Sequence, residues 1–289
     1  MIDDKQRRPS GAQSGQFCLG GREYRLGPAA ERGAVTAWPA AEAGGGVWDD
    51  VLIRRLRPGA GERQVRLFRL AWEAEAEQLD LPGARSLFFE QPESGCILRS
   101  FPKAPSLAAL FEQRPGPLPA EEALELTARL LRALEGFHSR GLLHLDIRAE
   151  QIYLLPSRRL FLDNCRALDM ERPEEDGLPR ALGPCAAPEL RLMNLAALDR
   201  ASDIFSCCAL LYRMLLGRPL TDAELMGTGL ARGLRQSLAR AQELPDARAD
   251  ELARLLWRGL HLLPQRRFSS ARELLGLVSG LRGGIEADA

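Results

Sequence analysis

Side chains that can do chemistry gather in a short apolar stretch in the middle of the chain. Asp146 follows His144 by two positions and has apolar neighbours on both sides. Arg148 stands two positions further on and Gln151 five positions after the aspartate, while a second aspartate, Asp163, follows the next apolar run. By itself, an aspartate between apolar residues is usually a turn former or a cap. Two carboxylates, a carboxamide and a guanidinium can together hold a metal ion and orient a hydroxyl group, so this stretch is the candidate active site.

The His144-Leu145-Asp146 triplet, with the polar residues that follow it, resembles the catalytic core of the protein kinases. The resemblance implies that Asp146 orients the substrate hydroxyl and that Arg148 lies near the transferring phosphate. It also implies that Gln151 and Asp163 bind magnesium, in the places of an asparagine and of the first residue of Asp-Phe-Gly. In such a site, rate comes from positioning and charge neutralisation, with little covalent work by the protein.

Three motifs later in the chain extend the resemblance. Ala187-Pro188-Glu189 is similar to the Ala-Pro-Glu that closes the activation segment of the family. Ser202-Asp203 resembles the start of the long buried helix whose aspartate braces the catalytic loop, and Arg267 resembles the late arginine that pairs with the glutamate of Ala-Pro-Glu. These motifs imply a protein-kinase fold and not that of the small-molecule phosphotransferases, which share the two aspartates.

The elements that must position these residues change in character along the chain. Short apolar runs predict strands near 24–26, 33–38, 51–54, 86–89 and 95–101, with one helix over 65–79 among them. After Pro102, helical periodicity predicts helices over 106–113, 120–139, 201–216, 247–263 and 269–281. We therefore expect an α+β, two-lobed protein-kinase-like fold, with a small strand-rich N-lobe and a larger helical C-lobe.

Composition and motif positions together suggest the domain boundaries. Residues 1–20 are polar and rich in glycine and serine, which predicts a disordered leader. The N-lobe is then expected over 21–101 and the C-lobe over 102–283, with a tail at 284–289.

The loop expected to hold the nucleotide phosphates has lost most of its glycines. The family's glycine-rich loop would precede Val35, and its three glycine positions are occupied by Pro28, Ala30 and Gly33. Proline and alanine cannot adopt the glycine dihedrals and leave less room for backbone N–H groups to approach phosphates. A register shift of one residue makes Gly27 the first glycine, but the second is still missing.

The third predicted strand, 51–54, resembles the Val-Ala-Ile-Lys of the family, with Arg54 in the lysine position. Arg54 is expected to pair with Glu75 on the N-lobe helix, with Glu73 and Glu77 as competitors for that pairing. The planar guanidinium is not interchangeable with the compact ammonium of lysine. Leu52 replaces a small residue over the adenine, where a larger side chain would intrude.

The metal-binding and switching residues also depart from the family. Gln151 is one methylene longer than asparagine, against the near-ideal octahedron that magnesium demands. Asn164 stands where a phenylalanine would pack beneath the helix that bears Glu75, and Leu145 replaces the arginine that would receive an activating phosphate. No serine, threonine or tyrosine occurs between Asp163 and Glu189, so this segment cannot be switched by its own phosphorylation.

Charge and composition exclude several classes of function. Thirty-nine basic residues balance thirty-nine acidic ones, so nucleic acid and membrane surfaces are not expected partners. The six cysteines and three histidines lack zinc-ligand spacing, which predicts reduced thiols and no structural metal. No signal peptide or membrane span is predicted, which favours a cytoplasmic location. The arginine, alanine, leucine and glycine bias is typical of a GC-rich, bacterial coding sequence.

The remaining cysteines and histidines have structural interpretations. Cys207 and Cys208 are expected to pack in a helix. Cys165 and Cys185 lie in the activation-like segment and leave redox switching open. His138 is expected to cap a helix. His144 resembles the structural histidine of the family and not a proton shuttle.

The losses on the nucleotide side predict a protein-kinase-like domain with weak or no phosphotransfer, acting as a regulatory or interaction pseudokinase. The alternative is an atypical active Ser/Thr kinase that uses ATP and magnesium through Asp146 and Asp163, with Arg54 replacing the lysine. Transfer of another nucleotide-derived group, or phosphorylation of a small molecule, also stays open. Under the first hypothesis no cofactor is required, and a protein partner or protein substrate is expected in either case.

Overall fold

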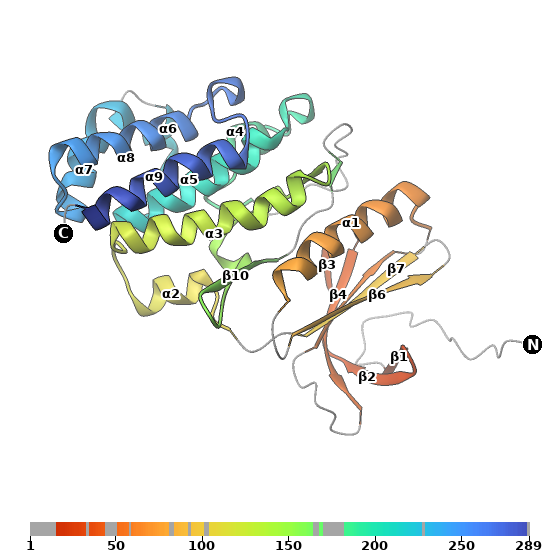
Figure 1. Ribbon diagram of the computed structural model, residues 1–289. Helices are drawn as coiled ribbons and strands as arrows, with labels where there is room; N and C mark the ends of the chain where they lie inside the picture. The colour runs from red at the N-terminus through yellow and green to blue at the C-terminus, as the bar shows by residue number, and fades with distance from the viewer. Residues whose placement is uncertain are drawn as a thin grey trace, which may run out of the picture. The chain divides into compact units, whose positions relative to one another are not determined.

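A computed structural model describes residues 16–32, 35–43, 51–57, 59–80, 84–91, 94–100, 104–163, 168–169, 182–226 and 229–287. The chain divides into two compact units, of which the first comprises Met1–Trp72 and Leu79–Lys103 and the second Glu73–Gln78 and Ala104–Ala289. Strands dominate the first unit and helices the second (Figure 1). The expected α+β fold with a strand-rich first part and a helical second part is therefore confirmed. No helix within the described ranges has the length and apolar character that a membrane span requires.

The first unit is built on an antiparallel seven-stranded sheet. Its strands are β1 (Gln16–Leu19), β2 (Arg22–Leu26), β3 (Ala30–Arg32), β4 (Val35–Glu42), β5 (Val51–Leu56), β6 (Arg85–Gln91) and β7 (Ser94–Ser100). Along the sheet the order is β1, β2, β4, β5, β7 and β6, and β3 pairs with β4 beside β2. Strand β1 lies inside the leader expected at 1–20, so that leader is too long. Leu19 is buried and Phe17 packs against the same apolar cluster, which ties this segment to the sheet.

Alternation along the strands gives the sheet two apolar faces. One face buries Ile53, Cys96 and Leu98 in a cluster with residues of β1, β2 and β4. The other face buries Leu56 and Ile97 against Phe68 of helix α1 (Glu62–Gln78). The indole Nε1 of Trp72, also on α1, donates a hydrogen bond of 2.8 Å to Ser86 Oγ on β6. The expected single helix therefore covers one face of the sheet.

The second unit is mainly helical. Its helices are α2 (Leu107–Gln113), α3 (Ala120–His138), α4 (Pro188–Arg191), α5 (Arg200–Leu216), α6 (Asp222–Met226), α7 (Gly229–Gln242), α8 (Asp246–Gly259) and α9 (Ala271–Ala287). Two small antiparallel pairs lie among them, β8 (Leu142–Leu143) with β11 (Leu168–Asp169) and β9 (Ile152–Leu155) with β10 (Arg159–Leu162). Helices α6 and α7 are absent from the sequence prediction, because α7 is arginine-rich and has only a narrow apolar row.

Helix α5 is the centre of the second unit. Nearly all its side chains are buried, which is the pattern of a helix surrounded by protein. Asp199 caps its first turn, with Oδ1 accepting a hydrogen bond of 2.8 Å from Ala201 N–H, and forms a capping box with Ser202. The helix ends at Gly217, which has a φ of 71° and whose missing Cβ would lie 2.6 Å from the backbone carbon of Gly116. Only glycine meets both demands.

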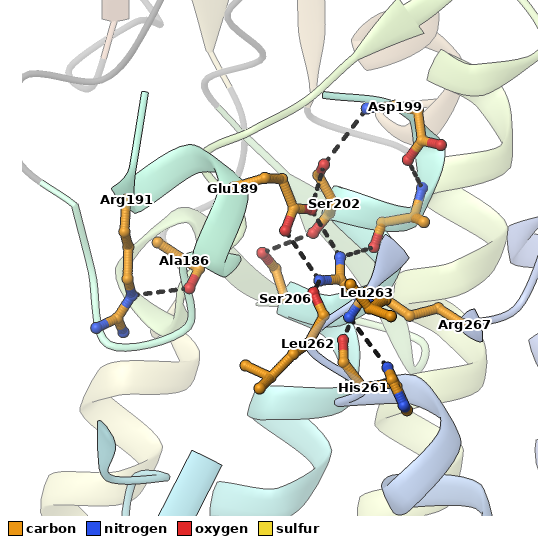
Figure 2. Close-up of polar contacts among 11 residues, drawn as sticks. Ala186, Glu189, Arg191, Asp199, Ser202, Ser206, His261, Leu262, Leu263 and Arg267 are labelled. Carbon is orange, nitrogen blue, oxygen red and sulfur yellow. Dashed lines mark hydrogen bonds and ion pairs between the residues drawn. The ribbon is translucent and has the colours of Figure 1, made fainter. Parts of the chain in front are cut away.

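A buried ion pair fastens α4 and α5 to the segment before α9 (Figure 2). Arg267 Nη1 and Nη2 donate hydrogen bonds of 2.6 and 2.9 Å to the two carboxylate oxygens of Glu189. The side chain of Arg267 is 0% exposed and that of Glu189 is 4% exposed. Ser202 Oγ donates a 2.6 Å hydrogen bond to the same carboxylate, and Arg267 also donates to the carbonyl oxygens of Ala201, His261 and Leu262. The predicted pairing is confirmed, and every hydrogen-bonding direction of the guanidinium is used.

Close contact between α5 and α8 gives the first prediction. A Cβ on Gly259 would lie 2.2 Å from Cys208 Sγ and 3.0 Å from Cys208 Cβ. Gly259→Ala is therefore expected to destabilise the protein by about 1–3 kcal/mol through overpacking. Gly233→Ala on α7 is the matched control, because its Cβ would meet no atom within 4 Å and the helix should gain up to about 1 kcal/mol. Urea unfolding measures both, and equal effects of the two changes would contradict the packing account.

Candidate active site

The loop that bears Asp146 is fixed by a carboxylate from α5. Asp203, fully buried, accepts hydrogen bonds from the backbone N–H groups of His144 (2.8 Å) and Leu145 (2.7 Å). Its Oδ2 also lies 2.9 Å from His138 Nε2 on α3. Burial by itself raises the pKa of Asp203, but the hydrogen bonds and charge of His138 and the contacts with His144 outweigh it and lower that pKa. A charged carboxylate therefore braces the loop, as the helix motif predicts.

Leu145 carries the backbone strain of the loop. Its φ of 54° lies in the left-handed region, which costs a non-glycine residue about 1–2 kcal/mol. The side chain is buried in a cluster with Leu143, Ala186, Leu190 and Leu198, and the N–H is bonded to Asp203. Burial and hydrogen bonding together offset the strain and turn the chain directly before Asp146.

His144 connects the two aspartates of the candidate site. Its Nδ1 accepts a hydrogen bond of 3.3 Å from Asp146 N–H, and its Nε2 lies 3.0 Å from the carbonyl oxygen of Asp163. A carbonyl oxygen can only accept, so the neutral ring with its proton on Nε2 satisfies both contacts. Burial lowers the pKa of His144 and favours this neutral form, against the raising influence of Asp203 and Asp146.

The four residues of the first motif come together in the second unit. Asp146, Gln151 and Asp163 are all buried, and Asp163 N–H donates a 2.8 Å hydrogen bond to the carbonyl oxygen of Gln151. Arg148 Nε lies 3.0 Å from Asp146 Oδ1. A carboxylate and a carboxamide are the hard oxygen donors that magnesium takes together with substrate phosphates, so the donor set of Gln151 and Asp163 fits such an ion.

A small cavity lies beside Asp146 and Arg148. The cavity that these two residues line has a volume of about 10 Å³, and Leu182, Gly183, Ala186 and Ser206 contribute to its walls. A single water molecule needs roughly this volume. This cavity can therefore hold about one water molecule.

The nucleotide-side residues lie in the first unit. Arg54 on β5 is buried, and its guanidinium carbon lies 5.8 Å from the centre of the Phe68 ring, within the range of a cation–π contact. Leu52, two residues earlier on β5, is half-buried, and Val35 begins β4 opposite Leu56. Gly33 and Asn164 lie outside the described residues.

The altered glycine-rich segment forms two short strands in place of a single long one. Gly27 N–H donates a 2.7 Å hydrogen bond to Pro39 O, and β3 resumes pairing with β4 at Ala30. A Cβ on Gly27 would lie 2.9 Å from Pro39 Cγ, so this glycine is required by close approach to β4. Pro28 and Ala30 are exposed.

The three candidate glutamates on α1 differ in their surroundings within the second unit. Glu75 is fully buried, whereas Glu77 forms an ion pair with Arg140 and Glu73 lies 3.9 Å from the same guanidinium. Glu73 and Glu77 therefore have a cation of their own. Arg54 and Glu75 belong to different units, and their pairing stays a prediction.

The sequence does not predict the contacts of two residues of the site, His138 and Gln78. His138 is expected to be a helix cap, but its ring bonds the buried Asp203. It follows the buried Leu134 by four positions, so the helical period places it on the inner face of α3. Gln78 Oε1 accepts a 2.8 Å hydrogen bond from Leu162 N–H next to Asp163, and no motif marks it.

Cys185, Cys207 and Cys208 of the second unit are buried packing residues. Burial raises the pKa of Cys185 and of Cys208 to about 12, and raises that of Cys207 well above its ordinary value. Thiols with such pKa values stay protonated near neutral pH and react slowly. Redox switching through Cys185 is therefore disfavoured, and Cys165 lies outside the described residues.

The buried neutral His144 makes stability depend on pH. Its pKa is lowered from 6.5, so as pH falls below about 6.5 the unfolded chain takes up a proton that the folded protein refuses. The free energy of unfolding is expected to fall between pH 7 and pH 5, as measured by urea unfolding at several pH values. His144→Asn should lower stability throughout and flatten this dependence. His261→Asn is the control and should leave the slope unchanged; an undiminished slope in His144→Asn would contradict the assignment.

Comparison with known proteins places these features in a family. No family model matches the chain. It is 28% identical over 222 residues to the serine/threonine-protein kinase pkn2 of Myxococcus xanthus, covering 69% of this chain and 25% of that protein. It is 28% identical over 225 residues to pkn3 of the same organism, covering 73% and 41%, and 34% identical over 126 residues to a Wee1-like protein kinase of Oryza sativa, covering 43% and 23%.

The chain spans less than half the length of these relatives, so their similarity concerns one domain. That similarity agrees with the buried aspartate of α5, the Glu189–Arg267 pair and the loop that joins the two candidate aspartates. The chain therefore carries a domain of the protein kinase superfamily.

Proposed function

We propose that this kinase-like domain is a pseudokinase, which regulates or binds other proteins and transfers phosphate weakly or not at all. The observation that carries the proposal is the ion pair in which Arg148 Nε lies 3.0 Å from Asp146 Oδ1. A substrate hydroxyl must reach the Asp146 carboxylate within hydrogen-bonding distance for that residue to act as a base. Here the Arg148 guanidinium lies against one oxygen of that carboxylate, so a substrate hydroxyl would have to share this oxygen or displace the arginine.

The nucleotide side supports the same conclusion from independent residues. Two of the three glycine positions carry Pro28 and Ala30, which hinder backbone N–H groups from cradling phosphates. Arg54 holds its planar guanidinium against the Phe68 ring, a contact that a phosphate-binding lysine does not need. Even small displacements of a reacting group cost orders of magnitude in rate, so these changes together predict little transfer.

Leu145 replaces an electrostatic switch by a permanent apolar contact. In the family this position holds an arginine that receives an activating phosphate, whereas Leu145 packs against Ala186 and Leu190 on either side of Pro188. Ala186 and Leu190 are thereby held without any modification. The sequence between Asp163 and Glu189 contains no serine, threonine or tyrosine. A contact that needs no phosphorylation suits an interaction module.

If nucleotide binds, Gln151 and Asp163 are the residues that would hold magnesium, and the ion would neutralise charge on the phosphates. Asp146 would then orient the acceptor hydroxyl, after Arg148 moves from its carboxylate. Assays of phosphate transfer and of nucleotide binding therefore distinguish the pseudokinase from the atypical active kinase.

Phosphate transfer separates the two readings of the site. With radiolabelled ATP and magnesium, and the protein itself and myelin basic protein as acceptors, transfer by the wild type is expected to equal that of Asp146→Ala and Asp163→Ala. Loss of Asp146 from a working kinase would cost at least about 100-fold, as removal of a general base does. Loss of Asp163 would remove a magnesium ligand and is expected to abolish transfer as well. Label that appears in the wild type and disappears in both variants would refute the pseudokinase proposal.

Nucleotide binding is tested by thermal unfolding. At 1 mM ATP with 5 mM magnesium, the stabilisation is expected to stay below about 0.5 kcal/mol, because a Kd of about 1 mM contributes only RT ln 2. This corresponds to a rise in Tm of roughly 1–2 °C for a chain of this size. A larger rise that Asp163→Ala abolishes and EDTA reverses would show a magnesium-dependent nucleotide site.

A further inference from the structure

Helix α1 is shared between the two units. Its residues up to Trp72 belong to the first unit, and its last part, Glu73–Gln78, belongs to the second. This last part is acidic, and the last turn of the helix contains no basic residue. Negative charge at the carboxyl end of a helix opposes the helix macrodipole, which attracts cations there. The end of α1 therefore depends on cations from elsewhere in the second unit.

Two arginines of the second unit supply these cations. Arg140, just after α3, forms an ion pair with Glu77, and its Nε lies 3.9 Å from a carboxylate oxygen of Glu73. Arg159 Nη2 on β10 donates a hydrogen bond of 3.4 Å to the carbonyl oxygen of Gln78. The side chains of Glu73 and Glu77 are 40% and 63% exposed, so the contacts with Arg140 face solvent and are released at little cost.

Gln78 connects the end of α1 to the residue before Asp163. Its Nε2 donates a hydrogen bond of 3.0 Å to the carbonyl oxygen of Ala74, which directs Oε1 to the N–H group of Leu162, 2.8 Å away. Asp163 N–H bonds the carbonyl oxygen of Gln151 before β9, so the alternation of an antiparallel pair turns Leu162 N–H to the opposite edge of β10. Leu162 is fully buried, and a buried N–H group at this edge needs an acceptor.

The hairpin that ends at Asp163 has little stability of its own. Strands β9 and β10 share four residue pairs, and a two-stranded pair is marginal in isolation. Its turn holds Ser157 and Arg158 at a φ of 57° each, in the left-handed region that is unfavourable for residues other than glycine. The end of the hairpin therefore depends on contacts from outside the pair, and the bond from Gln78 is directly adjacent to Asp163.

We propose that Glu73–Gln78 form a releasable strap across the edge of β10 that holds Asp163, the candidate magnesium ligand, in place. Gln78 is a positioning residue that acts on Asp163 through the neighbouring backbone. Arg140 keeps the strap attached through its contacts with the glutamates. Release of Arg140 is expected to loosen the end of the hairpin, although the arginine bonds α1 and not β10. The proposal concerns contacts inside the second unit and does not depend on whether the domain transfers phosphate.

Amide hydrogen exchange, followed by NMR on the full chain, tests the strap. The exchange rate of Leu162 N–H is divided by that of buried amides of α5, which report on opening of the whole unit. Gln78→Met keeps the length of the side chain but removes the oxygen acceptor, and it should raise this ratio up to about tenfold, the effect of one hydrogen bond. Gln64→Met, the same change near the start of α1, is the control and should leave the ratio unchanged.

Arg140 tests the attachment at a distance from β10, because its bonds go to α1 and to the carbonyl oxygen of Gly136. Arg140→Glu places like charges together and should raise the Leu162 ratio up to about fivefold. The charge swap Glu77→Arg/Arg140→Glu restores an ion pair and should return the ratio to within about twofold of the wild type. Arg132→Glu, on the exposed side of α3, is the matched control and should have no effect.

Salt gives a test that needs no folded variant. Between 0.1 M and 1 M salt the Debye length falls from about 10 Å to about 3 Å, which weakens the exposed ion pair. The Leu162 ratio is therefore expected to rise with salt in the wild type and to fall in Arg140→Glu, where salt screens a repulsion.

Three results would overturn the strap. The first is an unchanged ratio in Gln78→Met, since the bond would then protect nothing. The second is a ratio that responds to Gln78→Met but neither to salt nor to Arg140→Glu, which would make the contact purely local. The third is equal acceleration of Leu162 and of the α5 amides, or a charge swap that fails to restore the ratio, because the effect would then be on general stability.

Discussion

A carboxylate removed from water must be satisfied by the groups around it, and in this domain Asp203 meets that demand by ordering a loop. Two backbone N–H groups and a histidine ring converge on it, so the chain from His144 to Asp146 has one conformation. The ordered loop in turn positions the two candidate aspartates, because His144 bonds the backbone of both Asp146 and Asp163. The position of Asp203 depends in turn on α5, which is capped by Asp199 and fastened by the Glu189–Arg267 pair.

The same reasoning shows which parts of the site the sequence could predict. The resemblance to the protein kinases predicts the contacts of Asp203, Glu189 and Arg267, and the structure confirms them, as a buried charge needs a partner. His138 looks like a terminal cap because capping is common, and only its spacing from Leu134 places it inside. The role of Gln78 has no local pattern, since its partner Leu162 is 84 residues away. Such long-range contacts are fixed by tertiary packing, which periodicity cannot report.

The sequence likewise predicts the elements that have a strong local pattern and misses those that depend on tertiary packing. Helices α3 and α5 are long and strongly periodic, and both are predicted nearly to their ends. Helix α7 escapes because its arginines and glycines dilute the apolar row to Leu234 and Leu238, which are buried only through contact with neighbouring helices. Strand β1 escapes because four residues beside a polar leader carry too little pattern, although Leu19 is buried once the sheet forms.

The near absence of lysine limits what the first unit can do with the buried cation on β5. Only Lys5 and Lys103 occur in the chain, and that buried cation is Arg54. A buried lysine can lose its proton, but arginine keeps its charge at any physiological pH, and its flat guanidinium is stabilised by stacking as well as by carboxylates. Contact with the Phe68 ring provides such stacking within the first unit. The position therefore carries a permanent, oriented charge that supports the helix–sheet contact, a structural role that does not require a phosphate.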